Sequence, residues 1–298
     1  MAKQRADQGP QGIALVDKPS GWTSHDVVAK ARGRLGTRKV GHAGTLDPSA
    51  TGLLVLGVGR GTKLMAFLTG LEKTYTGEAV LGAATTTLDA DGEVTGTWDM
   101  AGVTLAEVRA AATGLTGALL QVPPMVSAKK VDGRRLHELA RAGIEVERPP
   151  VPVHVARYDV GEPVASGVFP ITVTCSSGTY VRSLVDDLGT ALGGGAHLRN
   201  LRRHEVGPFS VDEAVILEQL GPDRVLPPLA AFRGTAPVAV DAEVESQVRH
   251  GAVLARAALG VDPEAPGPWP VVDGTGALLA VYVAHRPGSV KPGLVLVP

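Results

Sequence analysis

The segment best suited to chemistry is a glycine-rich stretch that presents one carboxylate and one imidazole. Residues 41–52 read GHAGTLDPSATG, so Asp47 and His42 share a tight loop. A carboxylate held in such a loop can act as a nucleophile or as a general base. Asp47 also directly precedes Pro48, where a carboxylate suits a turn or a helix cap. The loop alone therefore leaves a catalytic and a structural interpretation open.

Two further polar segments carry tyrosines, of which the chain has only four. The segments KTYTG and SSGTYVR place Tyr75 and Tyr180 beside turn-forming residues. An aromatic face stabilises an unstacked base by about 1–3 kcal/mol, although a buried tyrosine with a hydrogen-bonded hydroxyl also fits the pattern. Arg182 follows Tyr180 by two positions, so both side chains lie on one side if the segment is extended. The pattern predicts a site that handles a planar base.

The sequence predicts no metal and no cofactor. Asp186 and Asp187 are neighbours, and adjacent side chains on a helix diverge, so we interpret them as helix carboxylates. Residues 57–63 read GVGRGTK, which lacks the spacing of a phosphate-binding loop. The single cysteine, Cys175, excludes an internal disulfide and a cysteine-based zinc site.

Helices and strands that can position these segments are marked by capping residues and apolar periodicity. Helices are predicted from Ser24 to a stop at Gly36, from the capping box Thr104 and Glu107, along the stripe 184–192, and from the capping box Ser210 and Glu213 to Gly221. Residues 74–81 and 170–176 have the β-rich, partly alternating pattern of strands. Strands and helices do not alternate regularly, which favours an α+β fold over a doubly wound sheet.

A change of pattern near residues 232–237 predicts a second, smaller unit. Beyond it, residues 271–283 read as a hairpin around the turn DGTG, and residues 291–297 as a closing strand. We predict a flexible tail over residues 1–11, a large domain over 12–232 and a β-rich unit over 233–298.

Composition is that of a soluble globular protein, with 44% hydrophobic and 20% charged residues. No apolar stretch reaches the roughly 18 residues that a membrane span requires. The first twelve residues lack the apolar core of a secretion signal. We therefore expect a cytoplasmic protein that does not interact with membranes.

The net charge of −1 hides three basic stretches. Residues 27–46 hold five lysines and arginines and no acid, and residues 188–204 hold Arg199, Arg202 and Arg203 without an acid. A third group includes Lys129 and Lys130. A polyanion responds to local patches more than to net charge. Nucleic acid is therefore a candidate partner, with ordinary solvated faces as the alternative.

In this order and spacing, the segments resemble the bacterial tRNA pseudouridine-55 synthase family of stand-alone enzymes. Further matching stretches are DKPSGWTS at residues 17–24, QVPP at 121–124, SAKK at 127–130 and GAHLRNLRR at 195–203. The resemblance covers roughly residues 12–210. The C-terminal unit resembles, more weakly, the small RNA-binding domain of the pseudouridine-synthase-and-transglycosylase (PUA) type.

The resemblance implies an enzyme that flips uridine-55 out of the T-arm loop of tRNA and isomerises it to pseudouridine without a cofactor. Its fold would be a mixed, largely antiparallel sheet flanked by helices, with an RNA-clasping insertion at about 121–150. It implies a monomer that needs no protein partner. The implied catalytic residues are Asp47, its ion-pair partner Arg182 and the stacking ring of Tyr75. The implied substrate-binding residues are His42, Tyr180, Leu201, Lys18, Lys129, Lys130, Arg202 and Arg203.

Two departures and two rival functions accompany the resemblance. The family commonly reads Thr-Asp-Thr where this chain has Thr85, Thr86 and Thr87, and its frequent tyrosine before Ser-Ala is Val126 here. A non-catalytic RNA-binding protein is one rival, against which the presence of Asp47 argues. A guide-RNA-dependent enzyme with protein partners is the other, against which the lack of lysine-rich tails argues.

We predict that RNA affinity falls steeply with salt despite the near-neutral net charge. Each phosphate neutralised adds about 0.7–0.9 to the slope of log K against log salt. A filter-binding titration measures this slope. A slope near zero would show that the basic stretches do not contact phosphates.

Overall fold

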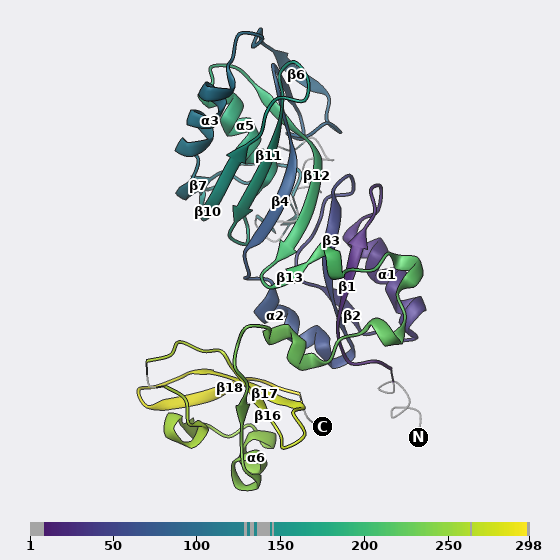
Figure 1. The fold of residues 1–298 in the computed structure, drawn as a ribbon, viewed down its shortest axis with the longest axis vertical. Helices are drawn as coiled ribbons and strands as arrows, with labels where there is room; N and C mark the ends of the chain where they lie inside the picture. The colour runs from purple at the N-terminus through teal and green to yellow at the C-terminus, as the bar shows by residue number, and fades with distance from the viewer. Residues whose placement is uncertain are drawn as a thin grey trace.

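The computed structural model describes residues 9–127, 130, 131, 134, 135, 144, 146–262 and 264–296. Within these ranges the backbone forms a nine-stranded sheet, a separate five-stranded sheet and two short hairpins (Figure 1). Helices lie against both main sheets. The predicted α+β class is confirmed. No helix in the described part of the chain is long and apolar enough to span a membrane.

The large sheet draws its strands from most of the chain before residue 211. Its strands are β1 (Gly12–Lys18), β2 (Val40–His42), β3 (Thr51–Val58), β4 (Lys73–Leu81), β7 (Gly117–Gln121), β10 (Val151–Val160), β11 (Val168–Cys175), β12 (Ala196–Val206) and β13 (Phe209–Ser210). Their order is β1-β3-β12-β4-β11-β10-β7, with β2 beside β3 and β13 beside β12. Only the β12–β3 pair is parallel among the described pairs of this sheet. The strands predicted at 74–81 and 170–176 are β4 and β11, and the sheet is mixed and largely antiparallel.

The helices follow from apolar stripes and caps. They are α1 (Ser24–Leu35), α2 (Met65–Leu68), α3 (Leu105–Gly114), α5 (Val181–Ala191) and, in the C-terminal unit, α6 (Ala242–Arg249). Helix α5 buries Leu184, Val185 and Leu188 against the large sheet, and α3 packs beside it. The stripe predicted at 184–192 is therefore α5. The capping box of Thr104 and Glu107 starts α3 as predicted.

Two local predictions about the chain near α1 and α5 need correction. Helix α1 is capped by Thr23, whose side chain accepts a hydrogen bond from the backbone N–H of Asp26, and not by Ser24. The Ser24 hydroxyl instead bonds the backbone of Leu46 across the fold. Tyr180 and Arg182 do not lie in an extended segment, since Tyr180 is the N-cap of α5 and Arg182 lies in its first turn.

The helix predicted from Ser210 to Gly221 does not form. The capping box of Ser210 and Glu213 is present, but it starts only a 3-10 turn of three residues. The next residues pair with β1: the N–H of Val215 donates to the Leu15 carbonyl, and that of Asp17 donates to the Val215 carbonyl. Pairing with a buried strand therefore outweighs the local helical signal.

Residues after 232 form the five-stranded sheet. Its strands are β14 (Val238–Ala239), β15 (Leu254–Ala255), β16 (Trp269–Val272), β17 (Leu278–Ala284) and β18 (Ser289–Val295). The predicted hairpin is β16–β17, and the predicted closing strand is β18. The turn between β16 and β17 is held by Asp273, whose carboxylate accepts from the backbone N–H groups of Thr275 and Ala277.

Apolar residues join the five-stranded sheet to the rest of the chain. Val281 and Leu296 share one buried cluster with Leu64 and Met65. The Arg60 guanidinium donates to the carbonyl of Leu296 at 2.9 Å. The change of sheet falls between β13 and β14, and the predicted domain boundary at 232/233 stays a prediction.

The remaining described strands form two small hairpins. They are β5 (Ala83–Thr85) with β6 (Val94–Thr97), and β8 (Lys130–Val131) with β9 (Arg134–Arg135). The loop between β5 and β6 carries Asp89, and its neighbours Leu88 and Ala90 bond the backbone of Leu198 in β12. This loop is therefore held against the large sheet.

We predict that Gly52→Ala destabilises the fold. Gly52 has φ +101° and pairs with Arg203, whose backbone oxygen would lie 2.2 Å from an added Cβ. Strain and overpacking together predict a loss of roughly 2–5 kcal/mol in the free energy of unfolding. Denaturant unfolding measures it.

The matched control is Gly33→Ala in α1, where an added Cβ meets no atom within 4 Å. Because alanine favours a helix interior, we expect this variant to gain about 0.5–1 kcal/mol. Equal stabilities for the two variants would contradict the close approach of β3 and β12.

Candidate active site

The loop that carries Asp47 is held in place from several elements. The Arg203 guanidinium donates to the carbonyls of Gly44 and Thr45 at 3.2 and 3.4 Å. The Ser24 hydroxyl accepts from the N–H of Leu46 at 2.9 Å. The carboxylate that follows is thus fixed by buried groups from β12 and α1.

Lys18 secures the other end of the same loop. Its ammonium donates to the carbonyls of Pro48 at 3.0 Å, Trp22 at 2.6 Å and Pro19 at 3.0 Å. Burial lowers the pKa of Lys18 to about 8, while the nearby Asp47 acts in the opposite direction. The side chain is completely buried. Lys18 therefore holds the loop and does not line the cavities described below.

Arg182, in the first turn of α5, makes the contacts that join the loops of the site. Its Nε lies 3.0 Å from Oδ2 of Asp47 and 3.5 Å from Oδ2 of Asp89. Its two terminal nitrogens donate to the carbonyls of Thr87 and Val126, each at 2.8 Å. The side chain is 5% exposed. Every nitrogen of the guanidinium therefore has a partner, and the ion pair of Asp47 with Arg182 that the resemblance implies is present.

The two sequence departures fall on these contacts without breaking them. Arg182 binds the backbone carbonyls of Thr87 and Val126, so the side chains at these positions do not contribute the acceptor. The Thr86 hydroxyl accepts from the N–H of Glu93 and helps close the loop that carries Asp89. The contacts of Arg182 are therefore compatible with threonine at residues 86 and 87 and valine at residue 126.

A cavity of about 340 Å³ opens on one side of the ion pair. Tyr75 of β4, Tyr180, Leu201 and Arg203 contribute to its wall, together with Asp47 and Arg182. The ring of Tyr75 is 8% exposed and also belongs to the hydrophobic core of the large sheet. The interpretation of Tyr75 as a core residue and its interpretation as a cavity residue are thus both compatible with the structure.

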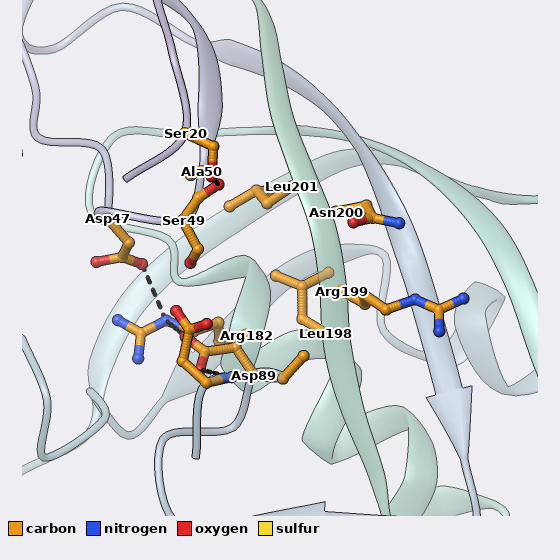
Figure 2. A pocket seen from close by; sticks show the side chains of 12 residues that line it. Ser20, Asp47, Ser49, Ala50, Asp89, Arg182, Leu198, Arg199, Asn200 and Leu201 are labelled. Carbon is orange, nitrogen blue, oxygen red and sulfur yellow. Dashed lines mark hydrogen bonds and ion pairs between the residues drawn. The ribbon is translucent and has the colours of Figure 1, made fainter. Parts of the chain in front are cut away.

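A second cavity of about 150 Å³ lies beside the first. Figure 2 shows its lining: Asp47, Arg182 and Asp89 are on one side, and Leu198, Arg199, Asn200 and Leu201 come from β12. Asp47, Arg182 and Leu201 line both cavities. The carboxylate of Asp47 therefore stands where two hollows meet.

Burial changes the acid–base properties of two groups in the site. It raises the pKa of Asp47 above its ordinary value, and the charge of Arg182 opposes this change. Burial also raises the pKa of Tyr75, so its hydroxyl stays protonated at neutral pH. Asp47 is thus a partly exposed carboxylate, with 38% of its side chain exposed, and its raised pKa strengthens it as a base.

Two residues of the site escaped the sequence interpretation. Asp89 contacts Arg182 because its loop is hydrogen-bonded to the backbone of β12. The sequence spacing between Asp47 and Asp89 does not indicate this contact. Gln121 begins the QVPP stretch, and the sequence predicts no role for its side chain. Its side chain donates to the Tyr180 carbonyl and accepts from the Tyr180 N–H at 3.1 and 2.7 Å. The family motif was the one available signal for Gln121.

Several predicted substrate-binding residues lie outside the linings of both cavities. His42 is in β2, and its ring meets that of His25 edge-on, with 5.6 Å between the ring centroids. Burial lowers the pKa of His42. Arg202 forms a two-bond ion pair with Asp17 at 3.0 and 2.8 Å. Arg203 does reach the larger cavity, but it is buried.

These contacts weaken one basic stretch as a phosphate-binding surface. Arg199 pairs with Glu78 and Arg202 pairs with Asp17, so both charges have acidic partners. Lys129 lies outside the described residues, and Lys130 is described only as the first residue of β8. Their contacts with a substrate stay predictions. Within the described ranges, His, Cys, Asp and Glu side chains form no group of three that could hold a metal ion.

The sequence model "TruB family pseudouridylate synthase (N terminal domain)" matches residues 32–181, and "tRNA pseudouridylate synthase B C-terminal domain" matches residues 182–224. The second match begins inside α5 and includes β12. The family's division in sequence therefore does not follow the division between the two sheets.

Curated relatives named tRNA pseudouridine synthase B match over most of the chain. The protein of Arthrobacter sp. (strain FB24) is 45% identical over 96% of this chain and 97% of its own length. That of Streptomyces griseus subsp. griseus is 46% identical over 95% and 96%. That of Rhodococcus jostii (strain RHA1) is 56% identical over 70% of each chain.

The fold is also found among solved structures. A chain in the "Crystal Structure of a Cbf5-Nop10-Gar1 Complex" superposes with a TM-score of 0.76 over 99% of this chain and 87% of that chain, at 23% identity. At this identity the likeness concerns the fold. The match to the family model and the full-length relatives show that this chain belongs to the TruB family of pseudouridylate synthases.

Proposed function

We propose that this chain isomerises uridine-55 in the T-arm loop of tRNA to pseudouridine, with Asp47 as the essential carboxylate. The observation that carries the proposal is the ion pair of Asp47 with the buried Arg182 at the edge of a cavity walled by Tyr75 and Tyr180. An assay of the lone protein on a tRNA transcript tests it. Absence of pseudouridine in the product would refute it.

The reaction needs little beyond a placed carboxylate. The N1–C1′ bond breaks, the uracil turns, and a C5–C1′ bond forms, while the C5 proton leaves and N1 gains one. Atoms and electrons balance without an oxidant, a reductant or a transferred group, so the proposal includes no cofactor. A carboxylate can serve as nucleophile or base, and Asp47 faces both cavities.

The environment of Asp47 supports this role. Its raised pKa makes it a stronger base, while the guanidinium of Arg182 keeps it oriented and favours its ionised form. Asp89 contacts the same nitrogen of the guanidinium and restrains it further. We propose that Arg182 and Asp89 act as positioning residues for the carboxylate.

The substrate must reach this carboxylate by leaving its stack. Unstacking costs a few kcal/mol, which stacking on an aromatic ring and contacts to the RNA backbone offset. Tyr75 is the ring proposed to take the uracil, with Tyr180 and Leu201 as further walls of the larger cavity. His42, Lys129, Lys130, Arg202 and Arg203 are the remaining proposed substrate contacts. Lys18 supports the site from behind.

The rest of the chain has proposed roles in holding tRNA. Residues 12–232 form the proposed catalytic domain with an RNA-clasping insertion at about 121–150, and residues 233–298 the proposed PUA-like domain. We propose a cytoplasmic monomer that acts without a protein partner. The solved structure with the similar fold contains Nop10 and Gar1 as partners. Those partners are a property of that complex and are not proposed for this chain.

We predict that Asp47→Asn abolishes product formation while tRNA still binds. Asparagine keeps the size and most hydrogen bonds of the side chain but cannot act as a nucleophilic carboxylate or as a base. Loss of acid–base catalysis alone lowers rates by about 10²–10⁴-fold. Single-turnover assays with excess enzyme measure the rate, and filter binding measures the affinity.

Arg182→Met serves as the companion variant. Removing the buried cation leaves two carboxylates and two carbonyls without their donor, so the rate falls severely and the fold loses stability. If Asp47 were only a turn residue, asparagine would be nearly neutral because both residues cap well. A rate for Asp47→Asn close to wild type would therefore end this proposal.

The roles of the Tyr75 ring and hydroxyl can be separated. Stacking needs only the ring, so we expect Tyr75→Phe to bind tRNA like wild type and Tyr75→Leu to lose about 1–3 kcal/mol of base stacking. If Tyr75→Phe binds tRNA like wild type but loses turnover, the hydroxyl takes part in proton transfer or its positioning. If both variants react and bind like wild type, Tyr75 is a core residue only.

A further inference from the structure

Strand β12 contains an irregularity directly beside the site. Arg199 pairs with Glu78 of β4, but the next pair is Arg202 with Thr76. Two residues of β12, Asn200 and Leu201, therefore stand opposite a single residue of β4, which is a β-bulge. The bulge falls at the point where β12 also begins to pair with β3.

The extra residue decides which side chains face the site. Along a regular strand, residues three apart point to opposite faces of the sheet. Leu198 nevertheless belongs to the hydrophobic cluster of the large sheet, and Leu201 packs against that same cluster. Leu198 and Arg203 also pair with Ala79 and Tyr75, which lie on that face of β4. The bulge therefore changes the alternation and places Leu201 on the face of Leu198, next to Asp47 (Figure 2).

The backbone of the bulge depends on Asn200. This residue has φ +55°, in the left-handed region that few side chains other than asparagine and aspartate enter readily. Its side-chain amide donates to Oε2 of Glu78 at 2.9 Å. The Arg199 guanidinium donates to the same oxygen at 2.6 Å. Glu78 thus connects both residues of the bend to β4.

The facing residue of β4 leaves room for the bulge. An added Cβ at Gly77 would lie 3.0 Å from Cδ1 of Leu198 and 3.3 Å from the carbonyl oxygen of Arg199. A side chain there would require the end of Leu198 and the backbone of Arg199 to shift by a few tenths of an ångström. The bulge is therefore built into both strands.

We propose that Asn200, locked to Glu78, is a positioning residue that sets where Leu201 projects between the two cavities. Among the described residues, Leu201 is the one apolar side chain that lines both cavities around Asp47. Its position therefore fixes how far a base in the larger cavity can shift relative to the carboxylate. Asn200 acts through Leu201 and does not itself contact the reacting base. This inference rests on the proposed function of the site.

The test measures single-turnover rates, tRNA affinity and melting temperature for substitutions at Asn200. A displacement of about 1 Å at a reacting centre can lower a rate by about 10²-fold. Asn200→Val, which disfavours a left-handed backbone, is expected to lower the rate by about tenfold or more, with tRNA affinity unchanged. Asn200→Gly, which adopts that backbone freely, is expected to stay within about threefold of wild type.

A second pair of variants covers the case in which Asn200→Val does not fold. Glu78→Ala removes the lock without straining the backbone and is expected to lower the rate about fivefold with a melting temperature within about 4 °C of wild type. Asp159→Ala is the matched control, because it also removes an arginine–carboxylate pair on a strand of the same sheet but borders neither cavity. It is expected to react like wild type.

A combination with Leu201→Val shows whether the lock acts through Leu201. If it does, Glu78→Ala lowers the rate less in the Leu201→Val background than in wild type. Rate losses that simply multiply, or a Glu78→Ala rate equal to that of Asp159→Ala, overturn the inference. An inactive wild-type protein would instead refute the proposed function, so the two failures are distinguishable.

Discussion

The site depends on one buried guanidinium. Arg182 brings together the loop of Asp47, the loop of Asp89 and the carbonyls of Thr87 and Val126, which come from segments far apart in sequence. A buried arginine is tolerated only when its donors are paired and its charge is balanced. Here one cation faces two carboxylates and orients both of them.

That guanidinium is itself held by the elements around it. It extends from the first turn of α5, whose apolar face packs on the large sheet, and Gln121 fixes the backbone of Tyr180 at the cap of the same helix. On the opposite side, Arg203 and Lys18 secure the loop of Asp47 through its carbonyls. Asp47 and Arg182 are therefore held by separate sets of contacts. The distance between them depends on how the large sheet places the Asp47 loop relative to α5.

Much of this could be predicted from the sequence, though by two routes. Caps and periodicity gave α3, α5, β4, β11 and the C-terminal hairpin, because these elements depend mainly on local residues. The pairing of Asp47 with Arg182 came from the family resemblance. The sequence predicted no role for Asp89, because its contact with Arg182 depends on a loop bonded to β12. Pairing between distant strands also explains why the helix predicted after Ser210 is absent: Val215 bonds to β1 instead.

The bulge at Asn200 illustrates the same limit. A single-residue irregularity in strand pairing is invisible in the alternation of GAHLRNLRR, yet it places Leu201 on the same face as Leu198. The contacts that stabilise it reach from β12 to Glu78, more than a hundred positions earlier. Sequence patterns can predict that a segment is a strand, but its register depends on contacts with the neighbouring strand.

The position of β12 has a consequence for how the chain folds. This strand is made late in synthesis, yet it lies between β3 and β4, which are made early. Until it arrives, β3 and β4 have no common neighbour, and their facing edges carry unpaired backbone groups. Closing such long loops is slow compared with forming helices and hairpins. Catalytic competence should therefore return late in refolding, and the nascent chain exposes open strand edges until residue 206 has been made.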